Sequence, residues 1–140
     1  KVVKQRFGEY VAKGPVVLAG FGEGADEAAL LARQEPAFFS RLVLVEGGQT
    51  LWSATAAGIF KAGGGERVLF VCSSSACREG GEQKAKITRT LDIPTELLFA
   101  GDLAGVFDGR VAKALSAKYS WLMSKDTRPL PQRRKAGRLD

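Results

Sequence analysis

The sequence predicts an α/β fold: a mainly parallel sheet of about four strands with helices on both faces. Four short runs are rich in β-branched or bulky apolar residues, and segments with helical spacing separate them. The first three runs are apolar on both faces, which is typical of strands that helices cover on both sides. The four runs lie at residues 16–19, 42–45, 68–72 and 96–100.

Five helices are predicted around these strands. The first has apolar residues at helical spacing and ends at Gly14-Pro15, and the second is alanine- and leucine-rich and is limited by Pro36. The third is short and stops at three glycines, and the last two carry an apolar stripe on one face. We expect these helices at residues 2–13, 25–33, 54–61, 82–91 and 111–123. Their alternation with the strands predicts right-handed crossovers.

Length and charge divide the chain into one domain and a basic tail. Its 140 residues are one domain's worth, and 45% of them are apolar. The net charge is +6, of which residues 125–140 carry +4. We therefore expect a domain over residues 1–124 and a solvated, flexible tail over 125–140, with nucleic-acid binding confined at most to that tail. No apolar run approaches the roughly 20 residues of a membrane span, so no membrane partner is expected.

Cys72 and Cys77 flank three serines and an alanine. The chain has no histidine, and a structural zinc ion takes four ligands, so no metal site is expected. No cofactor is expected either. A disulfide across this short loop and a pair of free thiols both fit the spacing, and the bridge is favoured in an oxidising compartment. Cys77 as a nucleophile would have only Arg78 and a helix N-terminus to activate it, which favours a structural role.

The glycines from Gly20 to Gly24 form a corner between a strand and a helix, and two kinds of site use such a corner. One is a dinucleotide site, since residues 20–25 fit the pattern G-x-G-x-x-A and an acid ends the next strand. The cofactor would then be bound by Gly20, Gly22, Ala25 and Glu46. Three carboxylates at the start of the helix oppose a pyrophosphate there: Glu23, Asp26 and Glu27.

The other is a nucleophile elbow, G-x-S-x-G, in which the central residue sits on a strained turn above the sheet. Residues 20–24 supply the outer glycines at this spacing, with Gly22 at the centre. Three stretches resemble, in order, the nucleophile, acid and histidine regions of bacterial α/β-hydrolases of the esterase and dienelactone-hydrolase type. They are VVLAGFGEGADEAALLARQEPAFFSRLVLVEGG, RVLFVCSSSAC and LLFAGDLAGVFDGRVAKALSAKYSWL. The resemblance covers residues 10–124.

The resemblance implies a hydrolase fold in which the catalytic triad is lost. Gly22 occupies the nucleophile position, Gly105 the histidine position, and Glu79 is the carboxylate nearest the acid position. A triad needs a nucleophile, a base and a residue that orients the base, so we expect no acyl transfer. A binding, scaffolding or oligomerisation role is expected instead, at a site formed by Gly20, Phe21, Gly22, Glu23, Ser74 and Phe107.

The family's earlier strands have no counterpart in this sequence. We therefore expect an incomplete hydrolase-like domain in which the first strand, from Val16 to Ala19, lies at the edge of the sheet. No lysine interrupts this apolar run, and Pro15 only precedes it. Exposed apolar edges pair readily with other strands. We expect a second copy, another protein chain or a further segment to cover this strand.

Overall fold

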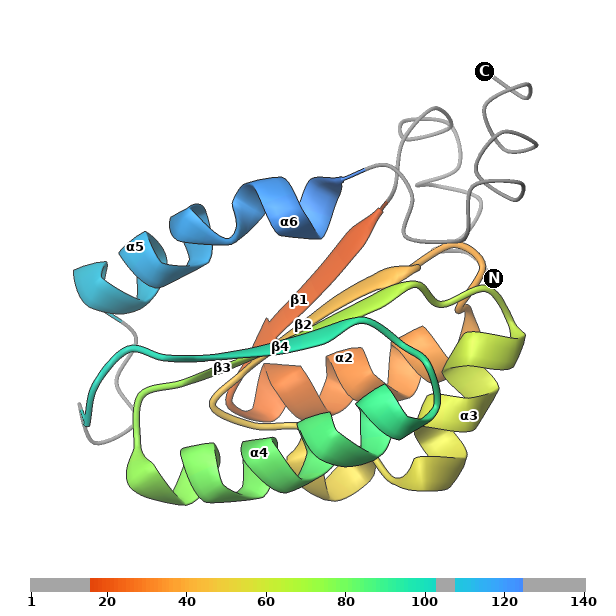
Figure 1. Ribbon diagram of the computed structural model, residues 1–140, viewed down its shortest axis with the longest axis horizontal. Coiled ribbons are helices and arrows are strands. Elements are labelled where there is room, and N and C mark those ends of the chain that lie inside the picture. Colours follow the sequence, from red (N-terminus) through yellow and green to blue (C-terminus); the bar gives the residue numbers. More distant parts are fainter. Residues whose placement is uncertain (1–15, 103–107, 125–140) are drawn as a thin grey trace.

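The computed structural model describes residues 16–102 and 108–124, and it confirms the predicted parallel sheet (Figure 1). Four strands pair in the order β1-β2-β3-β4, and every pair is parallel. They span Val17–Phe21 (β1), Arg41–Val45 (β2), Arg67–Cys72 (β3) and Thr95–Phe99 (β4), close to the four predicted runs. The helix predicted at residues 2–13 and the basic tail lie outside the described residues.

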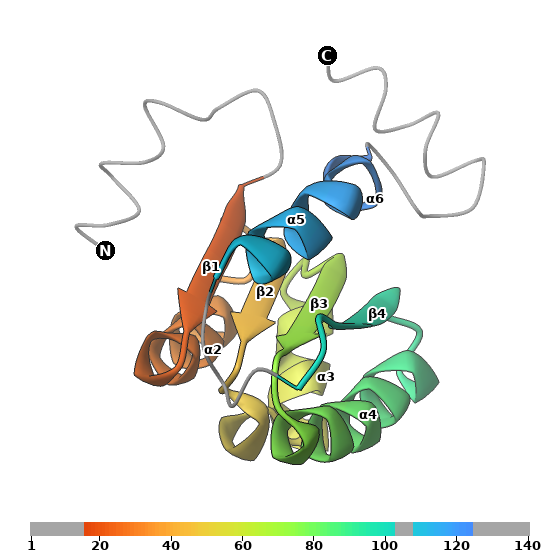
Figure 2. The ribbon, with the colours of Figure 1, turned by 90° about the vertical axis from the view of Figure 1, so that its left-hand side faces the viewer.

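The strand order determines which face each helix covers. Each crossover connection leads to the neighbouring strand, always in the same direction across the sheet. Crossovers of the same handedness therefore place their helices on the same face. This face carries α2 (Glu23–Gln34), α3 (Ala54–Ala62), α4 (Ser75–Thr90) and the short 3-10 helix η1 (Gln49–Leu51). The other face is covered by α5 (Gly109–Ala117) and α6 (Tyr119–Met123), as Figure 2 shows. No described helix is long and apolar enough to cross a membrane.

The two central strands are buried along their whole length because helices cover both of their faces. Their apolar side chains alternate between the layers. Those that pack with α2, α3 and α4 are Leu42, Leu44, Val68 and Phe70, and those that pack with α5 and α6 are Val43, Val45, Leu69 and Val71. The buried residues of α2 are all alanines, which lets this helix lie close to the sheet.

Helix α4 begins at Ser75, so the predicted start at residue 82 was wrong. Ser74 caps the helix, because its hydroxyl accepts a hydrogen bond from the backbone N–H of Cys77 at 3.2 Å. Gly80 and Gly81, which the sequence places in a loop, lie inside the helix. The packing explains the second glycine, since a Cβ at Gly81 would lie 2.9 Å from a methyl carbon of Leu97.

The single helix predicted at residues 111–123 was also wrong, because the chain breaks at Lys118 into α5 and α6. Lys118 has a turn conformation and its ammonium group pairs with Glu96 on β4 at 2.9 Å. Asp108 caps α5 by accepting from the backbone N–H of Arg110 at 2.9 Å. Desolvation raises the pKa of Asp108, but the backbone N–H groups of Arg110 and Val111 and the Arg110 guanidinium outweigh it. The pKa therefore lies below its ordinary value.

Two buried arginines attach α6 to the amino-terminal ends of β2 and β3. Arg41 and Arg67 are register partners on β2 and β3, and each is only 1% exposed. Arg41 donates to the carbonyls of Leu122 (2.6 Å) and Ser124 (2.7 Å), and Arg67 donates to the carbonyl of Trp121. Carbonyl groups at a helix C-terminus lack partners within the helix. The guanidinium groups therefore satisfy the end of α6 and complement its negative dipole.

We expect Arg41→Leu to lower the free energy of unfolding by about 3 kcal/mol, because the helix-end carbonyls and the Glu66 carboxylate lose their donor. Arg78→Leu is the control, since the ion pair of Arg78 with Glu82 is exposed, and we expect a change below about 1 kcal/mol. Urea unfolding followed by circular dichroism measures both. Equal losses in the two variants would contradict the role assigned to Arg41.

Candidate functional site

The carboxyl ends of the four parallel strands meet at one edge of the sheet, where α/β folds bind ligands. The predicted residues Gly20, Phe21, Gly22 and Glu23 form the β1–α2 corner at this edge. Gly22 has φ 59° and ψ −122°, the values of the second residue of a type II′ turn. Its N–H donates to the carbonyl of Val45 at 2.9 Å. Position 22 is therefore held above the sheet in a conformation that glycine adopts without strain.

The backbone is packed so closely around this corner that side chains are excluded on two sides. A Cβ at Gly20 would collide with the carbonyl of Gly24, and a Cβ at Gly47 would collide with the carbonyl of Gly22. A Cβ at Gly22 would meet no described atom within 4 Å apart from its own chain neighbours. The corner thus has space for a side chain at position 22, and the sequence leaves that space unfilled.

Glu46 links the end of β2, which lies beside this corner, to the end of β3. It comes directly after β2 and has φ 51°, a left-handed conformation that is uncommon outside glycine. Its carboxylate accepts hydrogen bonds from the backbone N–H of Ser73 at 2.6 Å and from the hydroxyl of Ser74 at 2.9 Å. The acid that a dinucleotide site would use for a ribose is thus bonded to the β3–α4 connection. A ribose hydroxyl would have to compete with these donors.

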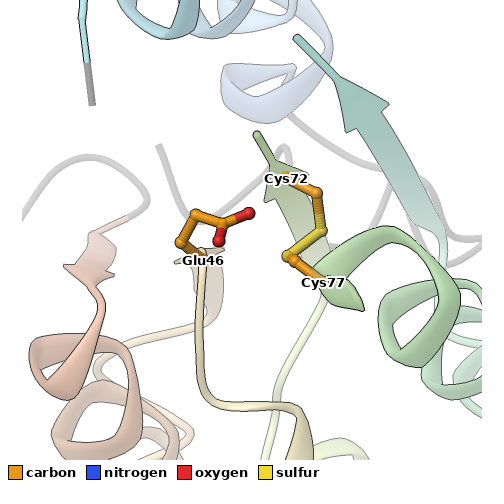
Figure 3. Close-up of side chains that lie close together, drawn as sticks. All are labelled: Glu46, Cys72 and Cys77. Carbon is orange, nitrogen blue, oxygen red and sulfur yellow. A yellow bond between two sulfur atoms is a disulfide. The ribbon is translucent and has the colours of Figure 1, made fainter. Parts of the chain in front are cut away.

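Cys72 and Cys77 form a disulfide, one of the two states that the sequence leaves open. Cys72 ends β3 and is fully buried, and Cys77 lies in the first turn of α4 and is 8% exposed. The side-chain amide nitrogen of Gln49 lies 3.0 Å from the sulfur of Cys77. Figure 3 shows the disulfide beside the Glu46 carboxylate. We refer to Glu46, Cys72 and Cys77 as the Glu46–disulfide cluster.

The structure brings together only some of the predicted site residues. Ser74 lies at the β3–α4 corner and is bonded to Glu46, whose strand neighbours β1 and the Gly22 corner. Glu79, the candidate acid, lies on α4 with an exposed side chain and is not part of the Glu46–disulfide cluster. Gly105 and Phe107 lie outside the described residues.

Sequence reasoning did not find Gln49 or Asp102 at this edge. Gln49 lies in a 3-10 helix of three residues, which is too short to show a periodicity. The preceding Gly47-Gly48 pair is a turn signal, and the Gly48 N–H donates to the Asp26 carboxylate at 3.0 Å. Asp102 accepts from the hydroxyl of Ser75 at 3.2 Å, a contact between residues far apart in the sequence.

We expect Gly22→Ala to lower the free energy of unfolding by about 1–2 kcal/mol, because an L-residue at φ 59° is strained. Gly24→Ala is a matched control, since a Cβ there also meets open space but the residue is helical. We expect this control to be neutral or stabilising by up to about 1 kcal/mol. Thermal and urea unfolding measure both variants. If Gly22→Ala were as stable as Gly24→Ala, the strained turn would be excluded.

The edge therefore offers hydrogen-bonding groups, a disulfide and an apolar strand, while the chain as a whole has no histidine to activate a hydroxyl or thiol nucleophile. The function of this edge therefore has to be inferred from the geometry of these groups. No family model, no curated protein and no solved structure matches this chain.

Proposed function

We propose that this chain is an α/β-hydrolase-like domain that has lost its catalytic triad and serves as an oligomerisation unit through the edge of β1. Position 22 carries the proposal. The turn has the conformation and the open space for a nucleophile, but the residue is glycine. With no side chain here and no histidine in 140 residues, a triad lacks both nucleophile and base.

The order of the elements supports the relationship to α/β-hydrolases. A strand, a glycine corner, a helix and the next strand follow one another as in the stretches that carry the resemblance, and a helical segment follows the last strand. The close approach of Gly20 to Gly24 fits the outer glycines of an elbow. The hydrogen bond between Ser74 and Glu46 does not replace a triad, because no imidazole lies between hydroxyl and carboxylate to transfer the proton.

The edge of β1 supports an oligomerisation role. Among the described residues, β1 pairs with β2 alone. The strand reads Val-Leu-Ala-Gly-Phe without a charge, Ala19 is exposed, and Phe21 is 44% exposed. An uncharged edge of this kind is a template for another strand. A second copy is the simplest partner, because two identical apolar strands can pair across a twofold axis without charge complementarity.

We expect the chain to hydrolyse p-nitrophenyl acetate and butyrate no faster than a heat-denatured sample, because position 22 has no nucleophile and the chain has no histidine. Gly22→Ser is expected to restore nothing, since a hydroxyl alone lacks a base. Release of p-nitrophenolate measures both. Turnover above the denatured blank that a serine-reactive phosphonate abolishes would contradict the loss of the triad.

We expect the chain to self-associate in sedimentation velocity experiments at micromolar concentrations. Ala19→Lys should raise the dissociation constant at least about tenfold, because a charged edge opposes strand pairing. Thr55→Lys, which adds the same charge at an exposed position of α3, should sediment like the unmodified chain. A chain that stays monomeric, with unprotected outward amides of β1 in hydrogen exchange, would exclude the proposed pairing.

A further inference from the structure

The Glu46–disulfide cluster gathers three groups that can bind a metal ion. A carboxylate oxygen of Glu46 and the sulfurs of Cys72 and Cys77 lie within 4.8 Å of one another. They come from three places in the fold, namely the residue after β2, the end of β3 and the first turn of α4 (Figure 3). Because separate packed elements hold them, their relative positions do not depend on the conformation of one loop.

We propose that the reduced form of this cluster binds a thiophilic divalent cation of the Zn²⁺ class, and that the disulfide is the closed form of the same site. Zn²⁺ binds cysteine sulfur at about 2.3 Å and carboxylate oxygen at about 2.0–2.2 Å, so ligand atoms of a tetrahedral site lie about 3.3–3.8 Å apart. Breaking the disulfide lets the sulfurs separate to this distance, with the carboxylate already adjacent. Water is the fourth ligand, as in zinc sites with three protein ligands.

Reduction and metal binding balance as two steps. Two small thiols break the S–S bond of Cys72 and Cys77, each cysteine sulfur takes a proton, and the small thiols leave joined as a disulfide. The cysteines thus gain the two electrons that the small thiols lose. When the cation binds, each cysteine releases its proton to solvent and forms a metal–sulfur bond. The Glu46 carboxylate adds the metal–oxygen bond.

The surroundings of the sulfurs suit thiolate ligands. The side-chain nitrogen of Gln49 lies 3.0 Å from Cys77 Sγ and 3.9 Å from Cys72 Sγ, so the amide can donate to a thiolate. Cys77 lies in the first turn of α4, where the positive end of the helix dipole favours a negative sulfur. Both cysteines are buried, which shields the ligands from exchange with water.

The surroundings of the carboxylate suit a ligand as well. The backbone N–H of Ser73 and the hydroxyl of Ser74 hold the Glu46 carboxylate in place, as outer hydrogen bonds hold the ligands of metal sites.

Titration of the full chain with Co²⁺ and Zn²⁺ before and after reduction tests the proposal. A phosphine reductant opens the disulfide, and alkylation with intact mass measurement verifies both redox states. We expect the reduced chain to bind one equivalent of Co²⁺ with a near-ultraviolet band from sulfur-to-metal charge transfer and with visible bands of tetrahedral geometry. Competition with a chromophoric chelator should show Zn²⁺ binding at least about 100-fold tighter in the reduced than in the oxidised chain.

A variant pair tests the third ligand. Glu46→Gln should weaken Zn²⁺ binding by the reduced chain about 10- to 100-fold while the sulfur-to-cobalt band persists, because both thiolates remain. Glu82→Gln, which neutralises an exposed carboxylate on α4, should bind Zn²⁺ like the unmodified chain.

Four results would overturn the proposal: equal Zn²⁺ binding by the oxidised and reduced chains, a cobalt spectrum without a sulfur band, unchanged affinity in Glu46→Gln, or loss of secondary structure on reduction. The last result counts because the proposal requires a folded site that exists before the metal binds. The comparison of redox states uses the unmodified chain, so it decides the question even if a variant fails to fold. These outcomes do not depend on self-association or on the absence of esterase activity.

Discussion

The complete burial of β2 and β3 requires a helical layer on each face of the sheet, and the two layers are attached in different ways. On the face of α2, α3 and α4, small side chains let the helices approach and Trp52 and Phe60 fill the larger space. On the other face, α5 and α6 bury few residues of their own. There the hydrogen bonds of Arg41 and Arg67 to the end of α6 orient a helix whose apolar contact with the sheet is small. The Arg41 guanidinium is tolerated out of water because its nitrogens donate to the Glu66 carboxylate and to the carbonyls of Leu122 and Ser124.

The same parallel arrangement directs all strand ends to one edge, and the packing there divides the edge into two regions. At the β1–α2 corner, backbone meets backbone so closely that Gly20 and Gly47 admit no side chain, and Gly22 is left in a conformation that disfavours one. Side-chain chemistry is therefore absent from the place where an elbow would present it. The polar and sulfur-bearing side chains lie one and two strands away, where Glu46 follows β2, Cys72 ends β3 and Cys77 lies in the first turn of α4.

Much of the fold could be predicted from the sequence because it depends on local patterns. The apolar runs of β2 and β3 mark strands buried on both faces, and the glycine cluster marks a tight corner. The start of α4 could not be found from periodicity, since Ser74 caps the helix and Gly81 is required by contact with Leu97. The break at Lys118 coincides with an ion pair to Glu96, a contact that is distant in sequence. The candidate site was harder to predict because its contacts also join residues that are distant in sequence.

The position of Glu46 could not be predicted, although the residue itself was noticed. At the end of a strand, a positive φ turns its side chain toward the next strand rather than toward the Gly22 corner, and sequence patterns do not report that turn. The expectation of no metal site considered two thiols alone, whereas the fold adds a carboxylate from 26 residues before Cys72.

The charge at the Glu46–disulfide cluster differs between its two redox states. Beside a disulfide, the carboxylate of Glu46 is one negative charge, and the N–H of Ser73 and the hydroxyl of Ser74 solvate it. Beside two thiolates, three negative charges would lie close together, and like charges at short range repel strongly in a partly buried site. A bound divalent cation would offset this repulsion. In the oxidised state the single carboxylate charge of Glu46 is solvated by hydrogen bonds, whereas in the reduced state the thiolate form is stabilised by a cation. The redox state of the cysteines is thus coupled to cation binding.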